Sequence, residues 1–284
     1  MSLRKTLVNH SSTLHRQPIR VGSRLGKYRL DRRVGHGAYA IVYAASDTLL
    51  GIKVALKIPT DAAMSPELLD EFRREVRLTM KLDHPNILPI RDATLIDGYL
   101  VIVTPLAGKT LDHRLRNRMS FETAFELLTQ LLEAVDHAHV RGVIHCDIKP
   151  ENILLFDDNR LRLADFGIAK AAQKTISGSG TGTVGHMAPE QAMGRPSMRS
   201  DVFSIGLIAY RMLAGQWPEY PFAWPMPGAA NLRRRAHPEL IAIIRKSLSV
   251  NPRHRYRSAT PMLSEWQKVR LKAMRFVKRR RAES

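Results

Sequence analysis

Short runs of β-branched and aromatic residues dominate the first hundred positions of the sequence. Such runs, bounded by glycine, proline and polar residues, are typical of strands. The pattern predicts two strands around a glycine turn between Tyr28 and Tyr43, then strands over 52–58, 88–93 and 99–104. Among them lies one helix. It begins with Ser65 as N-cap and Pro66 at the first position, and it ends at His84-Pro85-Asn86.

Beyond Gly108 the spacing of apolar residues becomes mainly helical. A Ser120 N-cap introduces the strongest amphipathic helix, which carries apolar residues from Phe121 to Val135 on one face. Further helices are predicted over 201–214, over 238–248 and from 261 onward, with short apolar runs over 153–156 and 161–164. The sequence therefore predicts an α+β fold with a strand-rich N-terminal lobe, one major helix in that lobe, and a mainly helical C-terminal lobe.

Charge is concentrated at both ends of the sequence. The net charge is +19; residues 1–33 carry nine basic side chains and one acidic, and residues 268–284 carry eight and one. We interpret 1–26 as a flexible basic arm, 27–267 as the folded domain and 268–284 as a basic tail. The first half of the last helix is expected to pack on the domain. Beyond Val269 its basic surface could contact anionic membranes, nucleic acid or another polyanion, or it could simply be solvated.

Several classes of protein are excluded by the composition. No run of 18 apolar residues is present, and the N-terminus lacks the apolar core of a secretory signal. The single cysteine, Cys146, excludes a disulfide within the chain and any multi-cysteine metal centre. These features predict a soluble, cytoplasmic protein without a transmembrane segment.

Three segments carry candidate chemistry for phosphoryl transfer. The glycines of 35–42 lie between two strands, where backbone N–H groups can approach phosphates, and Lys57 ends the strand that follows. The polar loop 145–152 contains Asp147, Lys149 and Asn152, which suit a proton acceptor, a phosphate partner and a magnesium ligand. A second carboxylate, Asp165, begins the Asp-Phe-Gly segment.

With the Met187-Ala188-Pro189-Glu190 segment, these motifs occur in the order and spacing of eukaryotic-type Ser/Thr protein kinases, and the chain resembles the bacterial members most. The resemblance covers about residues 28–265. It implies a bilobal fold with an N-lobe over about 27–104 and a C-lobe over about 107–267. It also implies transfer of the ATP γ-phosphate to Ser/Thr hydroxyls of protein substrates, with Mg²⁺ or Mn²⁺, and autophosphorylation.

The resemblance implies a role for each matching residue. Catalytic roles fall to the base Asp147, to Lys149, to the phosphate-binding Lys57 and to Glu75, which positions that lysine. The nucleotide is expected to lie against Val34, Gly35, His36, Gly37, Ala38, Tyr39, Ala40, Val42, Ala55, Lys57, Val103, Thr104 and Leu106. Asn152 and Asp165 would hold the metal, and Thr183 belongs to the activation segment. Structural support would come from His145, Glu190, Asp201 and Arg255.

The sequence departs from the family at positions that affect control and docking. Cys146 replaces the arginine that precedes the catalytic aspartate and binds activation-loop phosphate, so activity is expected not to depend on that phosphate. The prolines of 217–235 disfavour a long helix there, and Trp217, Phe222 and Trp224 are expected to pack. Arg233–Arg235 could favour acidic substrates or be a solvated face.

Three other functions compete with that of an active protein kinase. A pseudokinase scaffold is disfavoured because Lys57, Glu75, Asp147, Asn152 and Asp165 are all present. A small-molecule kinase is disfavoured by the activation segment and the motif that follows it. A nucleic-acid-binding module has only the basic ends in its favour, and they lack a recognisable reading motif.

Overall fold

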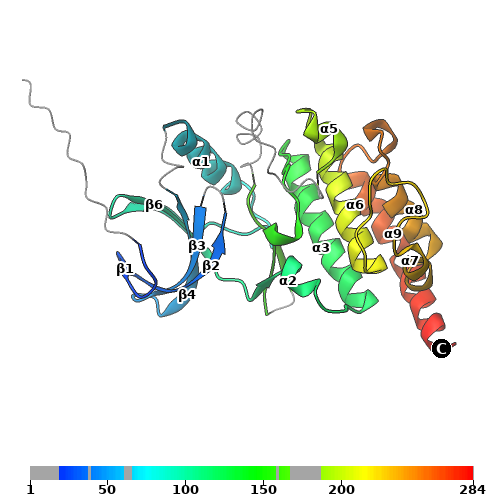
Figure 1. Ribbon diagram of the computed structural model, residues 1–284, viewed down its shortest axis with the longest axis horizontal. Helices are drawn as coiled ribbons and strands as arrows, with labels where there is room; N and C mark the ends of the chain where they lie inside the picture. Colours follow the sequence, from blue (N-terminus) through cyan, green and yellow to red (C-terminus); the bar gives the residue numbers. More distant parts are fainter. Residues whose placement is uncertain (1–18, 38–39, 61–65, 158–159, 167–186, 284) are drawn as a thin grey trace, which may run out of the picture. The chain divides into compact units, whose positions relative to one another are not determined.

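The computed structural model describes residues 19–37, 40–60, 66–157, 160–166 and 187–283. The chain forms two compact units, each described here by itself. The first contains the described residues up to 60 together with 91–106, and the second contains 66–90 and the described residues from 107 onward (Figure 1). The helix predicted within the N-terminal lobe therefore falls with the second unit. The segment that follows the helix explains this, because Leu82 and Ile87 are buried in the core of that unit.

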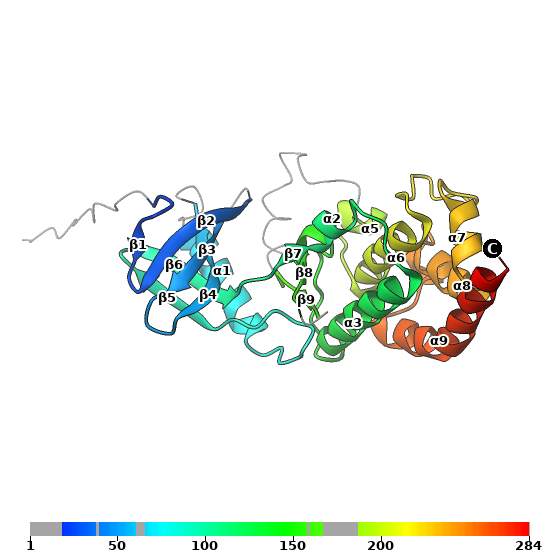
Figure 2. The ribbon, with the colours of Figure 1, turned by 90° about the horizontal axis from the view of Figure 1, so that it is seen from below.

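The first unit is a six-stranded antiparallel sheet in the order β1-β2-β3-β4-β6-β5 (Figure 2). Its strands are β1 (Arg24–Leu25), β2 (Tyr28–His36), β3 (Ala40–Asp47), β4 (Ile52–Pro59), β5 (Asp92–Ile96) and β6 (Tyr99–Pro105). Alternate residues of these strands bury one face, which confirms the strands predicted around the glycine turn and over 52–58 and 99–104.

The sheet begins before residue 27. Leu25 of β1 pairs with Tyr28 of β2, and both side chains are buried. Ile19 packs against the same core. The flexible arm expected over 1–26 is therefore wrong for residues 19–26, because a buried leucine and a strand pairing hold this segment to the sheet. Residues 1–18 lie outside the described part of the chain.

The strand expected over 88–93 begins only at Asp92. The N–H of Leu88 donates to the carbonyl of Leu163 at 2.9 Å, and Ile87 forms a bridge with the same residue. Pro89 has no N–H to contribute to a ladder. Residues 87–88 thus pair with β9 (Leu161–Leu163) of the second unit. The chain joins the sheet of the first unit only at Asp92.

The second unit is mainly helical and carries a small sheet in the order β7-β8-β9. Its strands are β7 (Lys109–Thr110), β8 (Ile153–Leu155) and β9 (Leu161–Leu163). Its helices are α1 (Pro66–Thr79), α2 (Leu111–Arg114), α3 (Phe121–Val140), α5 (Pro189–Ala192), α6 (Met198–Ala214), α7 (Ala229–Arg235), α8 (Pro238–Ser247) and α9 (Ala259–Ala282), with single turns η2 (Pro150–Asn152) and η5 (Pro252–His254).

Helix α6 begins three residues before the predicted position 201. Ser197 caps it by accepting from the N–H of Arg199, and Ser200 accepts from the N–H of Ser197, which forms a capping box. The helix ends at Gly215, whose φ of 80° is a conformation that suits glycine. Every residue from 200 to 210 is buried, so α6 forms the centre of the helical core.

Helix α9 lies beside α3 over most of its length, as Figure 2 shows. The indole of Trp266 stacks on Phe125 with ring centroids 4.9 Å apart, and its N–H donates to Thr129 Oγ1 at 3.0 Å. Burial continues along α9 through Val269, Ala273 and Val277. The apolar face expected beyond Val269 therefore packs on the protein's own core, and the exposed side of α9 there carries the basic residues together with Leu271.

The proline-rich stretch 217–235 contains only the short helix α7, as predicted. Phe222 packs edge-on against Phe203 at 5.2 Å, and Trp224 packs against Tyr210 at 5.7 Å. These aromatic side chains contact the core, which confirms the packing interpretation. Within the described residues, no helix is long and apolar enough to cross a bilayer.

Gly206, inside α6, is required by close packing against α8. A Cβ at this position would lie 2.2 Å from Ser247 Oγ and 3.1 Å from Leu248 Cδ2. We expect Gly206→Ala to lower the free energy of unfolding by about 1–3 kcal/mol, even though alanine favours helices. Urea denaturation measures this loss. In a Ser247→Ala background the nearest atom is removed and the loss should shrink; an equal loss in both backgrounds would contradict the proposed contact.

Candidate active site

The loop after α3 brings three of the predicted catalytic residues together. Lys149 Nζ lies 2.8 Å from Asp147 Oδ2, and Asn152 Nδ2 donates to the same oxygen at 2.9 Å. Asn152 also donates to the backbone carbonyl of Asp147 at 2.9 Å. The two charged side chains are about one-third exposed. A carboxylate held by a lysine and an amide, yet open to solvent on one side, can accept a proton from an incoming hydroxyl.

His145 connects this loop to the residues that follow β9. The N–H of Asp147 donates to His145 Nδ1 at 3.2 Å, so Nε2 carries the proton and donates to the carbonyl of Ala164 at 2.8 Å. The ring also packs edge-on against Phe166 at 4.6 Å and is fully buried. Both nitrogens of a neutral imidazole are thereby satisfied, which suits a positioning role.

The Asp201 carboxylate holds the backbone of the same loop. Its side chain is buried and accepts from the N–H groups of His145 and Cys146, each at 2.8 Å. It accepts a third bond from His139 Nε2 at 2.9 Å, while His139 Nδ1 accepts from the N–H of Ala259. One carboxylate thus joins α3, α6, the start of α9 and the polar loop.

Cys146 has a φ of 65°, a left-handed conformation that is uncommon for a residue other than glycine. The Asp201 bond to its N–H and the bond from Gln191 Nε2 to its carbonyl fix this conformation on both sides. The Cys146 side chain is buried. The residue therefore shapes the backbone immediately before Asp147 and supplies no positive charge there.

The two predicted metal ligands lie on neighbouring segments. The N–H of Ala164 donates to the backbone carbonyl of Asn152 at 2.9 Å, and Asp165 follows with a φ of 64°. Because the amide nitrogen of Asn152 bonds to Asp147, its oxygen is the atom suited to a cation. Among the described residues no group of three or more His, Cys, Asp or Glu could hold a metal alone. An Asn–Asp pair of hard oxygen donors fits a Mg²⁺ or Mn²⁺ ion whose other ligands are phosphates and water.

Arg255 and Glu190 form a buried bidentate ion pair that supports the segment following the catalytic loop. The two guanidinium nitrogens lie 2.8 and 3.0 Å from the carboxylate oxygens. Arg255 also donates to the carbonyls of Ser249, Arg199 and Val250. Burial lowers the pKa of the Arg255 guanidinium, an effect that Glu190 opposes. The Glu190 carboxylate and the three carbonyls thus offset the cost of burying the Arg255 charge, and the pair links α5 to the loop before α9.

The residues predicted to bind the nucleotide lie on β2, β3, β4 and β6 of the first unit. Gly35 is opposite Val42, Val42 is opposite Lys57, and Ala55 is opposite Thr104. Paired residues share a face, so the glycine strand and the lysine belong to one surface. A Cβ at Gly35 would meet only Val42 at 3.5 Å, an ordinary contact. The sheet therefore does not itself demand glycine there, which suits close approach of a ligand.

The other residues predicted to bind the nucleotide do not all lie on the surface that carries Lys57. Val103 is opposite Leu56 and packs with it in the buried core, so its side chain lies on the other face from Thr104. Val34 and His36 lie on β2, Gly37 donates its N–H to Ala40, and Leu106 follows β6. Ala38, Tyr39 and Thr183 lie outside the described residues. Glu75 lies in α1 of the second unit and Lys57 in β4 of the first, so their pairing stays a prediction.

Sequence reasoning missed three residues that complete these networks. His139 donates to Asp201, Gln191 donates to Cys146, and Ser200 Oγ donates to Glu190 at 2.8 Å. The sequence around each of these residues does not indicate its partner, because the partners lie 10 to 62 positions away. A polar residue on the apolar face of a predicted helix, as His139 is, was the available clue.

Comparisons with known proteins agree on one family. Residues 28–267 match the family described as "Protein kinase domain". Serine/threonine-protein kinase PknA of Mycobacterium tuberculosis is 36% identical over 272 residues, covering 85% of this chain and 61% of that protein. Serine/threonine-protein kinase PrkC of Bacillus subtilis is 32% identical over 261 residues, covering 85% and 40%. The chain thus spans about two-fifths to three-fifths of these curated relatives.

A solved structure shows the same fold. The M. tuberculosis PknI kinase domain superimposes with a TM-score of 0.68 at 25% identity, covering 89% of this chain and 99% of that one. The strand-rich first unit and the helical second unit therefore have the architecture predicted from the sequence.

Asp201→Asn should destabilise the protein. The amide group places an N–H donor against backbone and imidazole N–H groups that the carboxylate accepts from. One buried donor is left unsatisfied, and we expect the free energy of unfolding to fall by about 1–3 kcal/mol. Chemical denaturation followed by circular dichroism measures it. Asp112→Asn, at a half-exposed aspartate, is the control and should change stability by no more than about 0.5 kcal/mol; equal effects would refute the role of Asp201.

Proposed function

Since the chain belongs to the protein kinase family, we propose that it transfers the γ-phosphate of ATP to serine and threonine hydroxyls of proteins. The observation that carries this proposal is the cluster of Asp147, Lys149 and Asn152, which lies next to Asp165. The named Ser/Thr kinases among the relatives support the choice of acceptor.

In the proposed reaction, Asp147 orients the acceptor hydroxyl and takes its proton as the oxygen attacks the γ-phosphorus. The bond between that phosphorus and the β–γ bridging oxygen breaks, and ADP leaves with the electron pair. Lys149, 2.8 Å from Asp147, is placed to screen the negative charge of the transferred group. Asn152 and Asp165 would hold Mg²⁺, or Mn²⁺ in its place, which neutralises phosphate charge when bound.

The sheet unit supplies the proposed nucleotide contacts. Lys57 would bind the α- and β-phosphates, positioned by Glu75 of α1. The β2–β3 segment with Gly35 and Gly37 would cover the phosphates through backbone N–H groups. Ala55 and Val42, on the same surface as Lys57, would contact the base. A scaffold without transfer activity is disfavoured because Asp147 keeps both its lysine and its amide partner.

We also propose that the enzyme is active without phosphate on its activation segment. Activation-segment phosphate orders a loop only through a cationic partner, and the residue before Asp147 is the buried, uncharged Cys146. The backbone at that position is already fixed by Asp201 and Gln191. The polar loop thus needs no phosphate to adopt its conformation. Autophosphorylation of the segment can still occur without acting as the switch.

Asp147→Asn should lower the rate of phosphate transfer by about 10²–10⁴-fold, because it removes the proton acceptor. Binding of ATP should persist, since the proposed phosphate contacts lie on the sheet unit. Radiolabelled transfer to a generic basic protein, with phosphoamino-acid analysis, measures the first, and fluorescent nucleotide titration measures the second. Asp112→Asn is the matched control. Near-normal turnover in Asp147→Asn would exclude the mechanism.

Joint replacement of Thr175, Ser177, Ser179 and Thr181 by alanine should leave the initial rate close to that of phosphatase-treated wild-type protein. The physical reason is the missing cation at Cys146. Thr183 is kept, because in similar kinases its hydroxyl contacts the catalytic aspartate and lysine. A large loss of rate that acidic replacements restore would show that another cation substitutes for the arginine.

A further inference from the structure

A pocket distinct from the candidate active site opens at one end of the helical unit. Its volume is about 760 Å³, within the usual range of ligand pockets. Seven arginines line it, and no aspartate or glutamate is among the lining residues. The arginines are Arg116, Arg118, Arg211, Arg234, Arg235, Arg280 and Arg281. None belongs to the proposed catalytic machinery.

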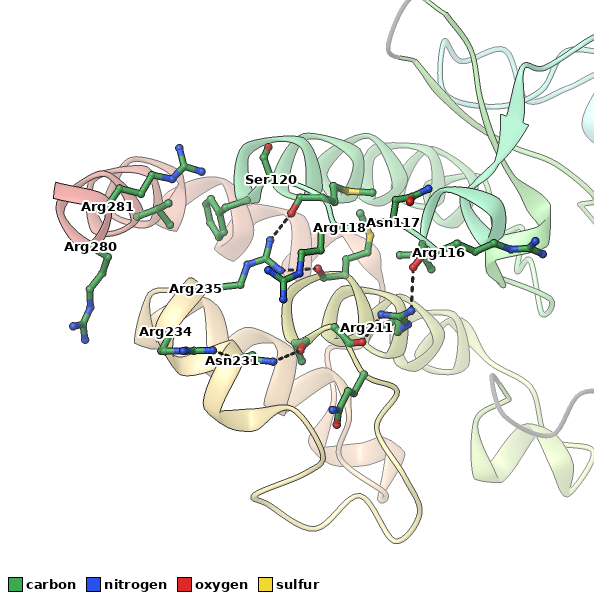
Figure 3. A pocket seen from close by; sticks show the side chains of 18 residues that line it. Arg116, Asn117, Arg118, Ser120, Arg211, Asn231, Arg234, Arg235, Arg280 and Arg281 are labelled. Carbon is green, nitrogen blue, oxygen red and sulfur yellow. Dashed lines mark hydrogen bonds between the residues drawn. The ribbon is translucent and has the colours of Figure 1, made fainter. Parts of the chain in front are cut away.

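Four segments that are distant in sequence converge on this pocket, as Figure 3 shows. They are the loop between α2 and α3, the end of α6, helix α7 and the end of α9. Between the charges the wall is mixed: it includes the buried Met119 and Val277 and polar side chains such as Asn117 and Asn231. Arginine side chains from four segments around one hollow make a concave, strongly positive site rather than a flat, solvated patch.

Among the described residues, three of the seven arginines have carboxylate partners. Arg281 pairs with Glu122 at 2.9 Å, while Arg116 and Arg280 have longer exposed pairs. In the part of the chain that the structure describes, no carboxylate pairs with Arg118, Arg211, Arg234 or Arg235. Burial and the neighbouring charges of Arg118 and Arg281 lower the pKa of the Arg235 guanidinium, an effect that Glu122 opposes. Like charges are therefore held close together, which an anion would relieve.

Two of these arginines are fixed in place by backbone carbonyls. Arg235 donates to Met119 at 2.6 Å and to Leu213 at 3.2 Å, and Arg211 donates to Gly215 and to Leu115. Arg211 uses each terminal nitrogen once, and Arg235 also donates to Met212 at 3.5 Å from the nitrogen that bonds Leu213. Each five-donor guanidinium still keeps N–H groups for a ligand. Ordering them costs no further conformational entropy on binding. The exposed Arg118 and Arg234 flank them (Figure 3).

We propose that this pocket docks a phosphorylated serine or threonine in a segment of a protein partner or substrate. Arg118 and Arg235, which lie close together, would share the phosphate, with Arg234 and Arg211 contributing at the rim. Phosphoserine carries about −1.5 to −2 charges and three acceptor oxygens, so it can serve two guanidinium forks at once. The proposal rests on the proposed function only in that a protein kinase generates such groups.

Other anionic partners fit the pocket less well. A carboxylate has one negative charge and two oxygens, too few to pair with several adjacent guanidinium groups. A membrane presents a plane, and a nucleic-acid duplex needs a stripe of charges along its repeating phosphates, whereas these arginines surround a hollow. A single dianion on an extended peptide segment matches both the concave shape and the concentrated charge.

Binding of a fluorescein-labelled peptide with one phosphoserine, measured by anisotropy on the full chain at physiological salt, tests this. The unphosphorylated peptide should bind at least about tenfold more weakly. The double variant Arg118→Gln/Arg234→Gln should lose about tenfold or more in affinity for the phosphopeptide. It leaves Arg235 and Arg211, which hold the backbone, untouched. Circular dichroism and thermal unfolding verify that the variant remains folded.

Lys268→Gln/Arg275→Gln is the matched control. It removes the same charge from exposed positions on α9 that do not line the pocket, and it should weaken binding by less than about twofold. Equal losses of affinity in the two double variants would show that the peptide is attracted only by the overall positive charge, and this would overturn the proposal. It would also be overturned if a peptide of equal charge built from aspartate bound as tightly. Loss of affinity for RNA or phosphatidylserine vesicles alone, with the phosphopeptide unaffected, would assign the pocket to those partners instead.

Phosphate transfer to a short unphosphorylated peptide separates this proposal from that of kinase activity. Wild-type protein and the Arg118→Gln/Arg234→Gln variant should transfer at equal rates, because the pocket shares no residue with the catalytic cluster. If neither protein transfers phosphate, the proposed function fails while the binding measurement still decides the docking site.

Discussion

The buried carboxylate of Asp201 is the constraint on which the catalytic loop depends. Removing an ionised group from water is costly unless hydrogen bonds replace its hydration. Here three donors do so, two from the backbone of His145 and Cys146 and one from His139. Because two of these donors belong to successive residues, the carboxylate selects the left-handed backbone at Cys146. That conformation then directs Asp147 toward Lys149 and Asn152.

The sequence allowed the architecture to be predicted more fully than the boundaries of its elements. Apolar periodicity located α3, β4 and β6 because each buries one regular face. It misplaced the start of β5, since the decisive contact of Leu88 is with Leu163, seventy-five positions away. It also missed β1, in which a two-residue strand is held by a single buried leucine. Neither contact leaves a local pattern.

The candidate site shows the same division. Asp147, Lys149 and Asn152 lie within one short segment, so their convergence could be expected from spacing alone. The supports Gln191 and Ser200 could not, because they act on partners brought near only by the fold. The arginine pocket is the extreme case. Its lining comes from four separate segments, and in the sequence Arg233–Arg235 reads equally well as a solvated run.

The packing of α9 on α3 also dictates an order of events during protein synthesis. The face of α3 around Phe125 and Thr129 is made early, but its partners Trp266 and Val269 are translated about 140 residues later. Domains generally fold as units while the ribosome proceeds from the N-terminus. This face of α3 therefore lacks its α9 partner for about half of the chain's elongation.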